Sequence, residues 1–211
     1  MTFRTDELKQ HLGFELPMRF IICIFHPETA FPEKHSKHCL QELLHALKQT
    51  VNDDDNNLHV VFMGSNADSS SDILGNIVKA FVKEDKRFLY IVNLARRHFV
   101  SLVKLSACVV GNSSAGLLEV PALKVPSVNV GNRQKGRERP TSVINVEADF
   151  KSISHGIHEA LTQNRENIYS CYPVINTSST ILSCLDSIPD FSSLLVKPFS
   201  PIMPISDVVI R

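Results

Sequence analysis

The sequence carries no excess of charge of either sign. Its 211 residues contain 22 Lys and Arg and 22 Asp and Glu, so the formal net charge is zero. A protein that binds nucleic acid or an anionic membrane surface usually presents a basic patch large enough to shift this balance. We therefore expect neither nucleic acid nor a membrane as a partner.

Long apolar runs and paired cysteines are also missing. No stretch reaches the roughly 18 apolar residues that a membrane-spanning helix needs, and the polar start MTFRTDELKQ does not resemble a secretory signal peptide. The five cysteines are odd in number and lack CxxC spacing, which indicates reduced thiols. Together these absences predict a cytoplasmic protein. The sequence shows no internal repeat either.

What the sequence does contain is a regular alternation of apolar and amphipathic segments. Near-continuous apolar runs such as RFIICIF are typical of strands buried on both faces of a parallel sheet. Apolar residues at i, i+3, i+4 and i+7 are typical of helices. We expect strands at 19–25, 58–63, 88–92, 107–110, 125–130 and 142–146. We expect helices at 37–49, from a cap at Asp72 through 81, at 97–106, and from a cap at Asp149 through 161.

This alternation predicts an α/β fold, a Rossmann-like parallel sheet with right-handed crossovers and helices on both faces. In such a sheet, ligands bind outside the carboxyl ends of the strands. The length suits one such domain with a proper core. We divide the chain into a lead-in or linker at 1–17, a Rossmann-like domain at 18–168 and a Pro- and Ser-rich C-terminal segment at 169–211, in which a helix survives at 178–185.

Anion-binding groups follow two neighbouring strands of the predicted sheet. After the strand at 107–110 come Asn112, Ser113 and Ser114. These small residues can cap a helix start and leave its first N–H groups open to an anion. After the strand at 125–130, a loop carries Arg133 and three further basic residues, and Arg recognises phosphate in a bidentate manner. These features predict a nucleoside-diphosphate pocket.

A short apolar helix after the serines carries Glu119, whose carboxylate could accept hydrogen bonds from sugar hydroxyls, and we expect Pro121 to disturb this helix. Each of these residues also has a simpler interpretation. The serines could be only N-caps, Glu119 only a surface residue, and the arginines only partners of Glu138 in solvated ion pairs. A nucleophile elbow and a Walker A loop are excluded, because GNSSAG has neither G-x-S-x-G nor Gly-Lys-Ser/Thr.

The string GNSSAGLLEVPALKVPSVNVGNRQKGR closely resembles the nucleotide-binding segment of the hydrolysing UDP-N-acetylglucosamine (UDP-GlcNAc) 2-epimerases. GNSS, a Glu five residues after the second Ser, and the GxRQxGR loop occur together at the family's spacing. The resemblance extends from about residue 8 to about residue 165 and corresponds to the C-terminal half of such an enzyme. It implies the second Rossmann-like domain of a GT-B fold, with the active site in the cleft between two domains. It implies no cofactor and no metal.

The resemblance also implies roles for individual residues. Ser113, Ser114 and Arg133 would contact the diphosphate of UDP, and Glu119 would accept the ribose hydroxyls. Arg137 would be structural or lie behind the contact residues.

Three further residues match family positions elsewhere in the chain. His26 follows a buried strand, precedes Pro27 and matches a catalytic His. Asn66 matches an Asn that faces the nucleotide sugar. Phe99 matches an aromatic beside the uracil, although its helical spacing fits core packing equally well. His35, His38 and Cys39 lie within one helical turn and lack the second ligand pair that a zinc site usually has.

The implied reaction is UDP-GlcNAc plus water to N-acetylmannosamine plus UDP, in amino-sugar metabolism leading to sialic acid. Most of the family's catalytic carboxylates belong to the N-terminal domain, so we expect this chain to need a missing N-terminal domain; a homo-oligomer is also possible. Two alternatives stay open. One is an inactive UDP-sugar-binding or regulatory module. The other is a non-hydrolysing epimerase, which His26-Pro27 disfavours because that branch usually has His-Arg.

Overall fold

The computed structural model describes residues 8, 12, 14–64, 71–172 and 176–195. The chain forms two compact units, residues 1–172 and 173–211.

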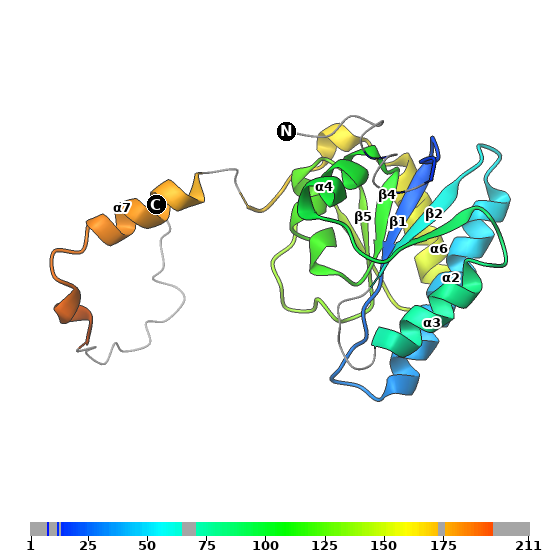
Figure 1. Cartoon of the computed structure of the whole chain (residues 1–211), viewed down its shortest axis with the longest axis horizontal. Coiled ribbons are helices and arrows are strands. Elements are labelled where there is room, and N and C mark those ends of the chain that lie inside the picture. The colour runs from blue at the N-terminus through cyan, green and yellow to red at the C-terminus, as the bar shows by residue number, and fades with distance from the viewer. Residues whose placement is uncertain (1–7, 9–11, 13, 65–70, 173–175, 196–211) are drawn as a thin grey trace. The chain divides into compact units, whose positions relative to one another are not determined.

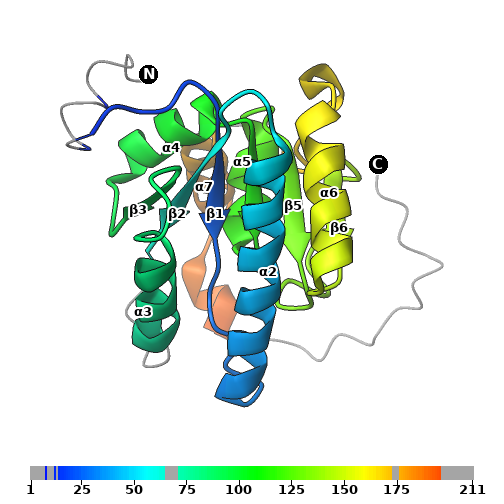
Figure 2. The same cartoon turned by 90° about the vertical axis from the view of Figure 1, so that its right-hand side faces the viewer.

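The first unit is built on a six-stranded sheet in which every strand pair is parallel. The strands are β1 (Phe20–Ile24), β2 (His59–Met63), β3 (Phe88–Ile91), β4 (Cys108–Gly111), β5 (Ser127–Val130) and β6 (Val143–Val146). Their order across the sheet is β3-β2-β1-β4-β5-β6 (Figures 1 and 2). This is the doubly wound order, and its direction reverses between β1 and β4.

Helices cover both faces of this sheet (Figure 2). On one face lie α2 (Glu33–Asp53), α3 (Ser71–Phe81) and α6 (Phe150–Thr162), and on the other lie α4 (Arg96–Leu105) and the short α5 (Glu119–Ala122). Side chains alternate between the faces, so in β1 Ile21 and Cys23 join one apolar cluster while Phe20, Ile22 and Ile24 join the other. The predicted Rossmann-like architecture is confirmed.

The ends of the elements differ from the sequence prediction by a few residues. Helix α2 begins directly after Pro32 and is longer at both ends than the predicted 37–49. Helix α3 begins at Ser71, so Asp72 lies inside its first turn and is not the cap. The predicted cap of α6 is confirmed, because the Ser152 N–H donates to Asp149 Oδ1 at 3.0 Å.

Residues before β1 also contribute to the first unit. Leu8 is fully buried, and Leu12, Phe14 and Leu16 pack against the apolar cluster on the α4 side. A short 3₁₀ helix at Arg165–Asn167 follows α6.

The second unit contains α7 (Thr177–Asp186), where a helix at 178–185 is expected, and a 3₁₀ helix at Phe191–Leu195. The Asn176 side chain caps α7 by accepting from the Ser179 N–H at 3.4 Å. Within the described part of the chain, no helix has the length and hydropathy needed to cross a bilayer.

Candidate functional site

The candidate site lies where the strand order reverses, at the carboxyl ends of β1 and β4. The two backbones approach closely there, and the Asn112 N–H donates to the Ile24 carbonyl at 3.1 Å. Gly111 makes this approach possible. Its φ is +139°, and a Cβ at this position would lie 2.0 Å from the Ile24 carbonyl oxygen. Glycine is therefore required at the end of β4, where the loops that follow β1 and β4 begin.

Asn112 connects the two loops through a buried side chain. It is fully buried, its Oδ1 accepts from the His26 N–H at 2.8 Å, and its Nδ2 donates to the His26 carbonyl at 2.9 Å. This pair of bonds fixes the backbone of His26 beside the GNSS segment. The expectation that Asn112 caps a helix is wrong, because its side chain reaches back to β1 instead.

The cationic loop is bound to the same residue. Arg133 Nη1 donates to the Asn112 carbonyl at 3.2 Å, and Gln134 Nε2 donates to that oxygen at 2.7 Å. Gln134 is buried, whereas the Arg133 side chain is exposed. Asn112 thus brings together residues from the ends of β1, β4 and β5, and the structure places Arg133 beside the serines as the spacing predicts. Sequence reasoning missed the anchoring role of Gln134.

The serines open a 3₁₀ helix, Ser114–Gly116, rather than an α-helix. Ser113 caps it, since Ser113 Oγ accepts from the Ala115 N–H at 3.4 Å and the Ser113 carbonyl accepts from the Gly116 N–H at 3.1 Å. A single 3₁₀ turn has little macrodipole. An anion at this point would be held by the two serine hydroxyls and Arg133 more than by helix N–H groups.

The interruption of this helical segment also falls earlier than predicted. It precedes Glu119, which is the first residue of α5. It falls at Leu117 and Leu118, four and three residues before Pro121, where the missing N–H and the ring of a proline disturb a helix. The disturbance expected from Pro121 thus lies on its N-terminal side, and α5 ends one residue after the proline, at Ala122.

Glu119 and Phe99 lie on the α4 side of the sheet. Glu119 Oε1 pairs with Arg96 Nη1 of α4 at 3.1 Å, and the Arg96 side chain is 76% exposed. So exposed a pair contributes little to stability, which leaves the carboxylate able to exchange partners. Phe99 is half-buried and packs against the apolar cluster on this face.

A second acidic residue, Glu28, lies close to His26 in the chain and was missed. It is 7% exposed, and its N–H donates to Ser36 Oγ at 2.9 Å. Its carboxylate reaches toward the end of β5, since a Cβ at Gly131 would lie 3.5 Å from Glu28 Oε1. Burial, and next the Glu28 charge, raise the pKa of the Cys39 thiol. A charged residue four positions after the end of the buried strand β1 was the available signal.

Glu28 also lines a cavity of about 210 Å³, together with Thr29, Phe31 and Ser36.

The predicted site residue Asn66 lies outside the described residues. Among those that are described, no ion pair involves the four cations of the 133–139 loop, and no three His, Cys, Asp or Glu side chains group as a metal site. His35 Nε2 and Cys39 Sγ contact one another at 3.6 Å.

The fold and the junction at Asn112 define a doubly wound α/β domain of the GT-B type. Among solved structures, the chain is similar to a UDP-GlcNAc 2-epimerase of Methanocaldococcus jannaschii in complex with UDP-GlcNAc and UDP. The TM-score is 0.64 at 14% identity, over 86% of this chain and 48% of that one.

The chain belongs to the UDP-N-acetylglucosamine 2-epimerase family, whose model matches residues 2–186. It is 41% identical over 153 residues to the polysialic acid biosynthesis protein P7 of Escherichia coli, covering 72% of this chain. It is 28% identical over 197 residues, 93% of this chain, to the hydrolysing UDP-N,N'-diacetylbacillosamine 2-epimerase of Legionella pneumophila. The chain spans only 37% and 50% of the lengths of these two relatives.

Proposed function

We propose that this chain is the UDP-sugar-binding half of a hydrolysing UDP-GlcNAc 2-epimerase, which converts UDP-GlcNAc and water into N-acetylmannosamine and UDP. The observation that carries the proposal is the junction at Asn112. The buried side-chain amide of Asn112 holds the backbone of His26, and the Asn112 backbone carbonyl accepts from Arg133. A histidine, a serine turn and an arginine thus meet at the point where the strand order reverses. Family membership supports the same assignment.

In this proposal the diphosphate of UDP binds between the serine turn and the loop. Ser113 and Ser114 donate through their hydroxyls, and Arg133 supplies a charge-assisted hydrogen bond. The same contacts stabilise the negative charge that develops on UDP as it leaves. Glu119 exchanges Arg96 for the ribose hydroxyls, and Phe99 contacts the uracil. Asn66 faces the sugar.

The chemistry requires removal of the C2 proton, expulsion of UDP and addition of water. His26 is the proton-transfer group that we assign on this chain, because its backbone is fixed beside the diphosphate site. Glu28 is buried two residues away and is a second candidate acid or base. The remaining acids and bases come from an N-terminal domain that this chain needs for turnover.

Two features favour the hydrolysing branch. His26 is followed by Pro27, and the similar Legionella pneumophila protein is named a hydrolysing enzyme. The name of the Escherichia coli relative favours a role in making an amino sugar on the way to sialic acid.

Isothermal titration calorimetry with UDP tests the binding assignment. We expect saturable binding by the chain, weakened by Arg133→Ala by about 1–3 kcal/mol, because a charge-assisted hydrogen bond is lost. Lys151→Ala is the matched control, since it removes an exposed cation from α6 and should leave UDP affinity unchanged. A folded chain that fails to bind millimolar UDP would refute the proposal.

A further inference from the structure

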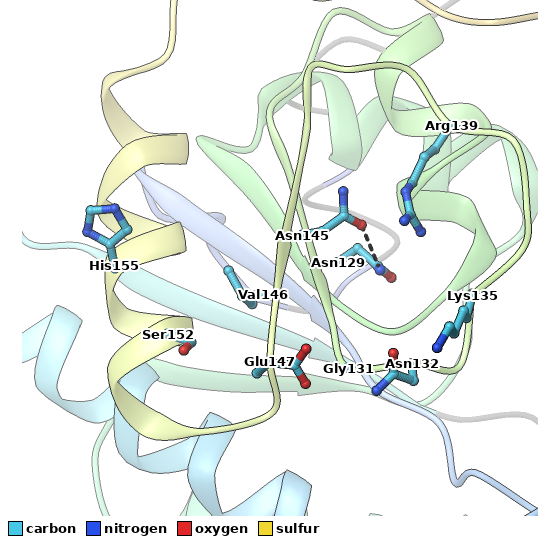
Figure 3. Close-up of a pocket in the computed structure, with 10 residues that line it drawn as sticks. All are labelled: Asn129, Gly131, Asn132, Lys135, Arg139, Asn145, Val146, Glu147, Ser152 and His155. Carbon is cyan, nitrogen blue, oxygen red and sulfur yellow. Dashed lines mark hydrogen bonds between the residues drawn. The ribbon is translucent and has the colours of Figure 1, made fainter.

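A separate cavity of about 480 Å³ opens at the carboxyl ends of β5 and β6 (Figure 3). The 133–139 loop contributes Lys135 and Arg139 to its wall, whereas Arg133 and Gln134 of the same loop bind Asn112 instead. None of the residues proposed to contact UDP lines this cavity. Its volume is within the range of small-molecule sites.

Two asparagines pair side by side at the base of the cavity. Asn129 of β5 and Asn145 of β6 are opposite one another in the strand register. Asn145 Nδ2 donates to the Val143 carbonyl at 3.0 Å, which turns Asn145 Oδ1 toward Asn129. Asn129 Nδ2 donates to that oxygen at 3.0 Å. Reversing the Asn129 amide would bring two oxygens together, so the hydrogen bonds fix its orientation.

This orientation leaves Asn129 Oδ1 as a buried acceptor. The side chain is 3% exposed, and its oxygen accepts no hydrogen bond from any residue that the structure describes. A buried acceptor without a donor is unfavourable. Water in the cavity can supply this donor, and so can a hydroxyl group of a ligand that displaces the water.

The charges around the cavity are arranged on two sides. Figure 3 shows Lys135 and Arg139 on the loop to one side of the asparagine pair, and Glu147 on the other side, toward α6. Neither cation forms an ion pair with a described residue. A ligand that matches this arrangement has an anionic group near the two cations and hydroxyls that donate to Asn129 Oδ1 and Glu147.

We propose that this cavity is a second binding site, for a small hydroxylated anion of the sugar-phosphate or sugar-acid class. The two cations bind the phosphate or carboxylate, and the asparagine and glutamate oxygens accept from the hydroxyls. The proposal does not depend on UDP binding at the Asn112 junction.

Amide NMR titration of the ¹⁵N-labelled chain tests the site. The combined probes, glucose 6-phosphate and gluconate, carry both an anionic group and hydroxyls. The half-probes are glucose, which has only the hydroxyls, and inorganic phosphate, which has only the anionic group. We expect saturable shifts around Gly131, Lys135 and the Asn129 side-chain amide with at least one combined probe, and weaker binding of both half-probes. Which combined probe binds more tightly distinguishes a phosphate from a carboxylate ligand.

Variants make the test specific. Arg139 is exposed, so Arg139→Ala should keep the fold. We expect this variant to bind the combined probe roughly tenfold more weakly. Asn129→Leu should weaken the combined probe without affecting inorganic phosphate. Arg133→Ala should weaken UDP alone, so failure of the UDP assignment is distinguishable from failure of this one. The proposal is overturned if neither combined probe saturates at millimolar concentration, if Arg139→Ala has no effect, or if UDP displaces the probe competitively.

Discussion

At the scale of single residues, Asn112 and Gly111 decide where the site can form. The Asn112 side chain bonds to residue 26, which is 86 positions earlier in the chain. Its carbonyl accepts from two side chains of the loop that follows β5. Gly111 permits these contacts by letting β4 approach β1. The site therefore depends on one backbone crossing more than on any single ligand-binding side chain.

Gly111→Ala tests this dependence. The new methyl group would overlap the Ile24 carbonyl and occupy a backbone conformation that alanine disfavours, so we expect a loss of roughly 3–5 kcal/mol in the free energy of unfolding. Urea denaturation followed by circular dichroism measures it. Gly136→Ala is the matched control: its φ is +83° but nothing lies within 4 Å of the added Cβ, so it should lose only about 1 kcal/mol. Equal losses in the two variants would show that the close approach is unimportant.

At the scale of elements, the turn between α3 and β3 is braced by Asp85 and Arg87. Arg87 Nη2 donates to Asp85 Oδ2 at 2.6 Å, and Arg87 Nη1 donates to the Val51 carbonyl near the end of α2 at 3.0 Å. Hydrogen bonds from the Arg87 side chain and backbone lower the pKa of Asp85 to about 2. The Arg87 side chain thus joins the turn before β3 to the end of α2, and the Asp85 carboxylate holds it in place.

This lowered pKa predicts a pH dependence of stability. The folded state favours the Asp85 carboxylate, so its contribution is present above the unfolded-state pKa near 3.8 and is lost as the pH falls toward about 2. We expect Asp85→Asn to reduce the free energy of unfolding by roughly 1 kcal/mol at pH 7, since the pair is partly exposed. The difference from wild type should shrink between pH 4 and pH 2 in thermal melts.

The control for this experiment is Asp55→Asn, which neutralises another exposed carboxylate in the turn after α2. This variant reports the effect of removing one negative charge that has no contact with Arg87. A constant difference for Asp85→Asn would mean that its carboxylate is not preferentially ionised in the folded protein.

The elements were predictable from the sequence because local pattern determines them. Strands buried on both faces appear as apolar runs, and Ile21 and Ile22 point to opposite clusters as such a run requires. Element ends were less predictable, since capping and proline position decide them. The position of Arg133 beside the serine turn was predictable, because the loops after neighbouring parallel strands meet at the same edge of the sheet. The Asn112 bridge, the Gln134 anchor and the Asn129 cavity depend on contacts between distant segments, and no local pattern encodes them.

At the scale of the whole molecule, our proposal is that the chain supplies one side of a reaction site. The described part provides a serine turn, an arginine and a fixed histidine at the switch point of one sheet. Proton transfer at an unactivated carbon needs acids and bases on both sides of the sugar. Positioning the substrate between two surfaces accounts for a further large part of such a barrier. One surface can therefore bind UDP without turning over the sugar nucleotide.

We accordingly predict that the 211-residue chain alone releases no N-acetylmannosamine from UDP-GlcNAc, whereas addition of the N-terminal half of a related family member, fused or in trans, restores it. A coupled assay for UDP, with chromatography of the sugar product, measures both outcomes. In the reconstituted enzyme, His26→Ala should abolish turnover while UDP affinity stays near wild type, because the Asn112 bridge uses only the backbone of residue 26. Robust turnover by the chain alone would place the required acids and bases on this domain, with Glu28 the first residue to test.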